Sequence, residues 1–198
     1  YNSYIVAYIR RVYSENGTVY PDIWVNLTKT DTGYTIHTSG TTRAAATGIS
    51  DITSSNQVGG TISFDQTIDG LPITQIGNDA FRYAMFTGEF YGSNLINIGS
   101  HGFYYSKFIG DLVLPEITML QLNVFTYSQF TGDLYIPKVK ILDNGFVSSS
   151  MSSFSGKLTA NVLTSVSSNI LRSANFSEQY TPKLTTIGKN NGNLKQSN

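Results

Sequence analysis

Residues 98–112 read IGSHGFYYSKFIGDL, and the same phrase returns three more times in the second half of the chain. The preceding copy, residues 76–90, reads IGNDAFRYAMFTGEF, and the following one, residues 120–134, reads LQLNVFTYSQFTGDL. A fourth, longer copy runs from Ile141 through Phe146 and Phe154 to Leu158. A period of about 20–29 residues is typical of a solenoid, in which each copy buries its apolar face against its neighbours. The sequence therefore predicts a repeat solenoid.

The aromatic residues set the step between copies. Phe81, Phe103 and Phe125 occupy the same place in three copies at a spacing of 22 residues, and Phe146 follows in the fourth. Equal spacing places like residues above one another in a solenoid. We expect these four rings to stack in the core.

The segment after each Gly-Asp pair has the pattern of a short strand. Apolar residues alternate with exposed positions, so Leu112 and Leu114, and likewise Leu134 and Ile136, should point inward, and a proline ends each run. The rest of each copy has no long helical pattern, which favours turns or short 3₁₀ segments. The predicted architecture is a solenoid of short parallel β coils.

The copies do not cover the whole chain. Two β-branched and aromatic runs flank the turn Asn16-Gly17, which indicates an antiparallel pair that could cover the first coil. We expect four parts: an N-terminal β-hairpin cap (1–36), an irregular connection or degenerate coil (37–60), the solenoid (61–188) and a polar tail (189–198).

Composition argues against several functional classes. Charged residues make up 13% of the 198 residues, and 13 basic side chains balance 13 acidic ones. A nucleic-acid-binding protein normally carries a basic patch, and the longest basic run here is Arg10-Arg11. No apolar run approaches the 18 or so residues of a spanning helix. We expect neither nucleic-acid binding nor a membrane span.

The residues also offer little chemistry for catalysis. The chain has no cysteine, which excludes disulfides, thiolate metal sites and cysteine nucleophiles. Its two histidines, His37 and His101, have no second ligand at metal-binding spacing, and no Gly-x-Ser-x-Gly motif is present. We expect no enzyme activity, no cofactor and no metal site.

Stacking the copies brings side chains into columns about 4.7–4.9 Å apart. Asp111 and Asp133 fall in an acidic column that begins with Glu89, and Tyr91 and Tyr135 fall in the column beside it. Tyrosine supplies large contact area at low entropy cost, and carboxylates accept hydroxyl donors. Tyr91, Asp111, Asp133 and Tyr135 are therefore the first candidate ligand-binding face.

Two alternatives remain open at this point. Gly-Asp is also turn chemistry, in which the aspartate accepts hydrogen bonds from main-chain amides where the strand begins. A third column, on the turn side of each copy, holds Tyr83, Tyr105, Tyr127 and Ser148. These tyrosines form the second candidate face.

The copies resemble the BspA-like leucine-rich repeats, a short-strand class of surface proteins. The residues that carry the resemblance are Ile76-Gly77-Asn78-Asp79-Ala80-Phe81 and Leu134-Tyr135-Ile136-Pro137. The family often has a cysteine after the phenylalanine, where this chain has Ala84, Ser106, Ser128 and Ser150. The resemblance implies an extracellular or cell-surface location and a role in adhesion or recognition, and it carries over no catalytic residue.

Two functions follow from these observations. The first is a non-enzymatic recognition or adhesion module that binds a protein or glycan on a host or neighbouring cell. The alternative is a structural subunit of an extracellular filament, fibre or virion appendage. It rests on the strand-forming N-terminus and on the lack of a recognisable C-terminal cap, because an uncovered strand edge invites self-assembly.

Overall fold

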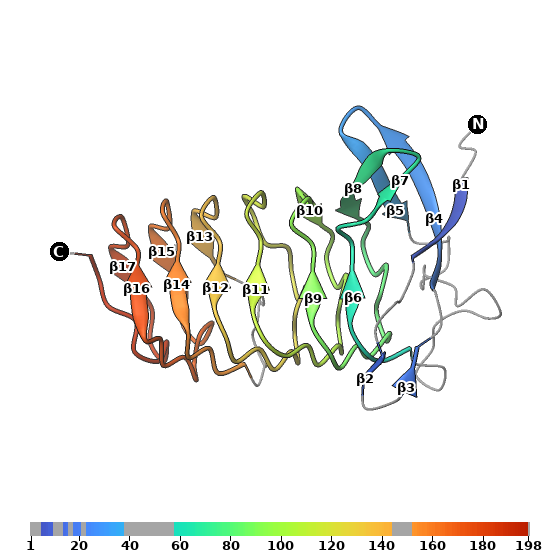
Figure 1. Ribbon diagram of the computed structural model, residues 1–198. Helices are drawn as coiled ribbons and strands as arrows, with labels where there is room; N and C mark the ends of the chain where they lie inside the picture. Colours follow the sequence, from blue (N-terminus) through green and yellow to red (C-terminus); the bar gives the residue numbers. More distant parts are fainter. Residues whose placement is uncertain are drawn as a thin grey trace.

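The computed structural model describes residues 5–9, 14–15, 18–20, 23–37, 58–143 and 152–197. Within these ranges the chain is a β-solenoid of about 5 turns with no helix, which confirms the predicted fold class. The coils follow one another along a single axis, with the N-terminal strands at one end and the C-terminus at the other (Figure 1).

Most strands are only two or three residues long. Their bounds are β1 (Ile5–Ile9), β2 (Ser14–Glu15), β3 (Thr18–Val19), β4 (Ile23–Thr30), β5 (Gly33–His37), β6 (Ile62–Ser63), β7 (Thr67–Ile68), β8 (Leu71–Ile76), β9 (Phe90–Tyr91), β10 (Asn97–Ile98), β11 (Leu112–Val113), β12 (Leu134–Tyr135), β13 (Ile141–Leu142), β14 (Lys157–Thr159), β15 (Ser165–Val166), β16 (Glu178–Tyr180) and β17 (Thr186–Ile187). Turns connect them, as expected.

Each coil contributes to two rows of parallel strands. The first strand row follows the order β6, β9, β11, β12, β14 and β16, and the second strand row follows the order β8, β10, β13, β15 and β17 (Figure 1). In the first row Leu112 pairs with Leu134, and Leu134 pairs with Leu158. Leu112, Leu114, Leu134 and Ile136 are fully buried, which confirms the predicted inward face.

Two columns of phenylalanine rings fill the core. In the first column, Phe103 lies parallel to both neighbours, with its ring centroid 5.4 Å from that of Phe81 and 5.7 Å from that of Phe125. The prediction that these rings stack in the core is confirmed, while Phe146 lies outside the described residues. The second column has centroid distances of 5.5–6.0 Å and contains Phe86, Phe108, Phe130, Phe154 and Phe176.

A column of small residues beside the rings contains buried hydroxyl groups. Ser128 Oγ and Ser152 Oγ each donate to the preceding coil, to Ser106 O and Ser128 O respectively. Ser152 Oγ also accepts the amide of Phe130 at 3.0 Å. These serines satisfy main-chain groups that the apolar core would otherwise leave unpaired. In the fourth copy the column uses Ser152, whereas the expected Ser150 lies outside the described residues.

The N-terminal strands extend the second strand row beyond the first coil. β1 pairs with β4 and β4 with β5, both antiparallel, and β5 then runs parallel to β8. Ile9, Ile23, Leu27 and Ile36 are fully buried. The region expected to be a simple hairpin instead contains strands β1 to β5 among its described residues, and β5 joins it to the solenoid. Most of the expected connection, residues 38–57, lies outside the described residues.

Residues 189–197, expected to belong to a polar tail beyond the solenoid, hydrogen-bond to its last coil. Asn191 Oδ1 accepts the amides of Ile170 and Leu171, at 3.1 and 2.9 Å. Asn193 likewise accepts the amide of Phe176, at 2.9 Å. Asparagine side chains thus cover the main-chain groups of the last coil, a capping role that no apolar pattern reveals.

Replacing Phe103 with alanine should lower the free energy of unfolding by about 3–5 kcal/mol, the usual cost of removing a buried aromatic ring. The ring is fully buried between Phe81 and Phe125. Chemical denaturation measures the change, and Lys107→Ala, at an exposed position of the same turn, is the control. A Phe103→Ala variant as stable as that control would contradict the stacked core.

Replacing Asn191 with alanine should lower stability by about 2–4 kcal/mol, because it leaves two buried amides without an acceptor. Lys189→Ala, at an exposed position nearby, should change stability little. Thermal unfolding of both variants checks the difference. Equal midpoints would show that residues 189–197 do not cap the solenoid.

Candidate functional site

The first candidate face lies on the exposed side of the first strand row. Tyr91 and Tyr135 are 39% and 38% exposed, and Val113 lies between them on β11 with similar exposure. The three side chains project outward because each follows a buried residue of its strand. The two tyrosines therefore lie on one face, with a coil between them.

The aspartates of this face are engaged in holding the coils together. Asp111 Oδ1 accepts the amide of Asp133 in the next coil at 2.6 Å, and Asp133 Oδ1 accepts the amide of Lys157 at 2.8 Å. Each bond is charge-assisted, which makes it stronger than a neutral hydrogen bond. The carboxylates thus accept main-chain amides where the strand of the next coil begins. This geometry supports the interpretation of Gly-Asp as turn chemistry more than a role of the aspartates in ligand binding.

Two glycines, each one coil after an aspartate of this face, have a matching role. A Cβ atom on Gly132 would overlap Asp111 Oδ1, and a Cβ atom on Gly156 would overlap Asp133 Oδ1. Only glycine leaves room for the carboxylate of the preceding coil. The motif is therefore an inter-coil clamp, and these hydrogen bonds offset the repulsion between stacked acids.

The second candidate face is more unusual. The rings of Tyr83 and Tyr105 stack with centroids 5.0 Å apart, and those of Tyr105 and Tyr127 stack at 5.1 Å with an interplanar angle of 3°. We call Tyr83, Tyr105 and Tyr127 the tyrosine ladder. Tyr83 and Tyr105 are partly buried and Tyr127 is exposed, so the rings lie at the surface of the turns.

All three ladder residues have left-handed backbone conformations, with φ of 68°, 74° and 76°. Residues other than glycine lose roughly 1–2 kcal/mol there, and asparagine, aspartate and histidine tolerate the region best. A second left-handed position of each turn follows that rule, since it holds Asp79, His101 and Asn123, whereas Met85, a third such position in the first turn, does not. Tyrosine is thus kept at strained positions where other residues would fit with less cost.

Two side chains that the sequence did not single out complete the ladder. The Tyr104 ring lies edge-on to Tyr105, with centroids 4.2 Å apart, and contacts Tyr127 at 5.6 Å. The guanidinium of Arg82 lies 5.2 Å from the ring centroids of both Tyr83 and Tyr104. The doublet Tyr104-Tyr105 is the sequence signal that could have indicated Tyr104. No sequence signal indicates Arg82.

The environment keeps the Tyr104 hydroxyl protonated. Desolvation by burial is the largest cause, and together with hydrogen bonds to Tyr105 and Tyr127 it raises the pKa of Tyr104 to about 12. Tyr104 is therefore a neutral hydrogen-bonding group over the whole physiological pH range. The surface offers hydroxyl groups, ring edges and one guanidinium.

The described residues contain no group of three or more histidine, aspartate and glutamate side chains that could hold a metal ion. His101 occupies a turn, where its Nε2 lies 3.2 Å from Asn123 Nδ2 and its Nδ1 lies 4.0 Å from Asp79 Oδ1. These contacts connect three successive turns. No helix in this part of the chain has the length and apolar character needed to cross a bilayer.

Comparisons with protein families, with curated proteins and with solved structures gave no match to this chain.

Proposed function

We propose that this protein is a non-enzymatic recognition module that binds another protein through the tyrosine ladder. The observation that carries the proposal is the stack of three surface tyrosines at left-handed positions. Backbone strain persists where the surrounding structure enforces it, and it clusters at functional sites. The phenylalanine columns already stabilise the stacking of the coils. We therefore assign the tyrosine ladder a role in binding, through the surface that it presents.

The stacking favours a protein ligand over a glycan. A sugar packs against a free aromatic face, and Tyr105 has both of its faces covered by Tyr83 and Tyr127. What remains available are ring edges and hydroxyl groups, together with the guanidinium of Arg82. Tyrosine and arginine are enriched among the residues that dominate protein–protein binding energy.

The proposed setting is an extracellular or cell surface, with a partner on a host or neighbouring cell. It rests on the resemblance of the coils to BspA-like leucine-rich repeats, which we propose as the relatives of this chain. Extended surfaces built from equivalent residues of stacked repeats are the usual binding sites of solenoids.

The two other candidates have weaker support. On the first face, Asp111 and Asp133 are engaged by amides of the following coils, so that face loses half of its proposed contact groups. The filament alternative assumed an uncovered C-terminal end. Residues 189–197 hydrogen-bond along the last coil, which weakens that premise.

The test is a binding panel of purified extracellular-matrix and cell-surface proteins, run beside a glycan array. The variant carries Tyr83→Phe, Tyr105→Phe and Tyr127→Phe, which keeps the rings and removes the hydroxyls. We expect the wild type to bind at least one protein on the panel and no glycan. The variant should lose about tenfold or more in affinity for that protein, equivalent to about 1.4 kcal/mol.

A matched control carries Tyr91→Phe and Tyr135→Phe, the same chemical change on the first candidate face, and it should bind like the wild type. Thermal unfolding of both variants separates lost binding from lost folding. Absence of protein binding by the wild type, binding unaffected by the ladder substitutions, or loss in the control alone would overturn the proposal.

A further inference from the structure

The second strand row is interrupted at one coil. Elsewhere in the row each coil hydrogen-bonds to the next, as when the Gly99 amide donates to Ile76 O at 2.7 Å and the Ser167 amide donates to Leu142 O at 2.9 Å. No main-chain hydrogen bond joins residues 118–121 to residues 96–99 or 140–143, all of which are described. β10 and β13 therefore each have an unpaired edge facing this coil.

The interrupted coil also differs from its neighbours in sequence. The pair Ile98-Gly99 corresponds to Leu120-Gln121 in the next copy. A Cβ atom at Gly99 would lie 2.7 Å from the backbone carbon of Gly77 in the preceding coil. Gln121 has such an atom, although Ser167, at the same place of a later coil, also has one and still donates its amide to Leu142 O.

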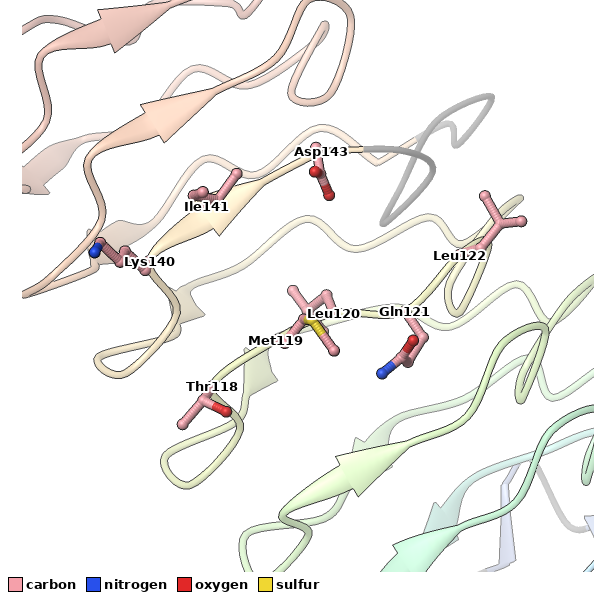
Figure 2. A pocket seen from close by; sticks show the side chains of 8 residues that line it. All are labelled: Thr118, Met119, Leu120, Gln121, Leu122, Lys140, Ile141 and Asp143. Atoms are coloured by element: carbon pink, nitrogen blue, oxygen red, sulfur yellow. The ribbon is translucent and has the colours of Figure 1, made fainter.

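A groove lies beside the interrupted coil. It has a volume of about 480 Å³ and separates residues 118–122 from residues 140–143. Figure 2 shows that Ile141 lies on the strand of one coil and Met119 on a neighbouring segment that forms no strand. Met119, Leu122 and Ile141 are 60%, 48% and 47% exposed, so the groove has an accessible apolar lining.

The apolar lining is specific to this place in the solenoid. Met119 and Ile141 occupy the outward position of their coils in the second strand row. In the other coils the same position is polar and is held by Gln75, Asn97, Ser165 and Thr186. Apolar side chains therefore replace polar ones only in the two coils that border the groove.

Charges of opposite sign border the groove. Lys140 lies before β13 and Asp143 lies after it, at the two ends of the strand (Figure 2). Neither forms an ion pair with a described residue. A strand parallel to β13, as β15 is on its other side, could place an acidic side chain near Lys140 and a basic one near Asp143.

From these observations we propose that the groove binds an extended segment of a partner protein with the pattern acidic, apolar, apolar, basic. Its main chain pairs with the unpaired edge of β13, and an apolar side chain enters between Met119 and Ile141. This is recognition by strand addition, in which main-chain bonds give affinity and side-chain pockets give specificity. The site is separate from the tyrosine ladder and does not depend on the function proposed for it.

The test measures fluorescence anisotropy of a labelled peptide, Ser-Glu-Val-Leu-Lys-Thr, titrated with the full chain. Two comparison peptides are the charge-exchanged Ser-Lys-Val-Leu-Glu-Thr and the polar Ser-Glu-Ser-Ser-Lys-Thr. We expect saturable binding of the first peptide and at least about tenfold weaker binding of the other two. Failure of the first peptide to bind, or equal binding of all three, would overturn the proposal.

Protein variants locate the site. Met119→Asn with Ile141→Ser introduces the residues found at the same position in neighbouring coils, so the fold should persist while binding falls about tenfold or more. Val113→Thr, at an exposed apolar position of the first strand row, is the matched control and should bind normally. Lys140→Glu with Asp143→Lys should reverse the preference and bind the charge-exchanged peptide. Unchanged binding by the groove variant or an unchanged charge preference would contradict the site.

Discussion

The hydrogen bond from each coil to the next is the interaction on which the rest of the structure depends. Leu112 donates its amide to Asp133 O, and the same coil presents Asp111 Oδ1 to the Asp133 amide, so main chain and side chain enforce one register together. With the register fixed, identical residues face each other, and Phe103 lies parallel to Phe81 and Phe125. The Gly-Asp pair, the phenylalanine columns and the tyrosine ladder all follow from that repetition.

The sequence predicted those features that repeat along the chain. Phe103 was placed in a stack and Leu112 on an inward face because equal spacing in a solenoid means equal surroundings. Three features were not predictable in this way. β5 joins the solenoid through a parallel pairing with β8, which lies far along the chain. Asn191 caps main-chain amides with a polar side chain. The left-handed φ of Tyr105 is a backbone dihedral angle that the spacing of apolar residues does not encode. For the candidate sites, the repeat spacing placed equivalent side chains in columns. The hydrogen bonds of the structure then determined which of those side chains remain available to bind a ligand.

Both proposed binding surfaces lie where the chain departs from what stacking alone requires. In the ladder the departure is conformational, because tyrosine occupies a backbone region that strains it. In the groove it is a loss of hydrogen bonding, in the coil where Gln121 stands at the place of Gly99. A solenoid of identical coils would present a uniform surface, and such departures give it distinct places for recognition.

Amide hydrogen exchange, resolved residue by residue, tests this account most directly, because it reports the stability of each inter-coil bond. The account predicts slow exchange at Leu112, Leu114 and Ile136, whose amides donate to the following coil, and exchange faster by orders of magnitude at Thr118 and Gln121. Gln121 as strongly protected as Leu112 would show that the second strand row is continuous. Rapid exchange at Leu112 would show that the register does not hold the coils together.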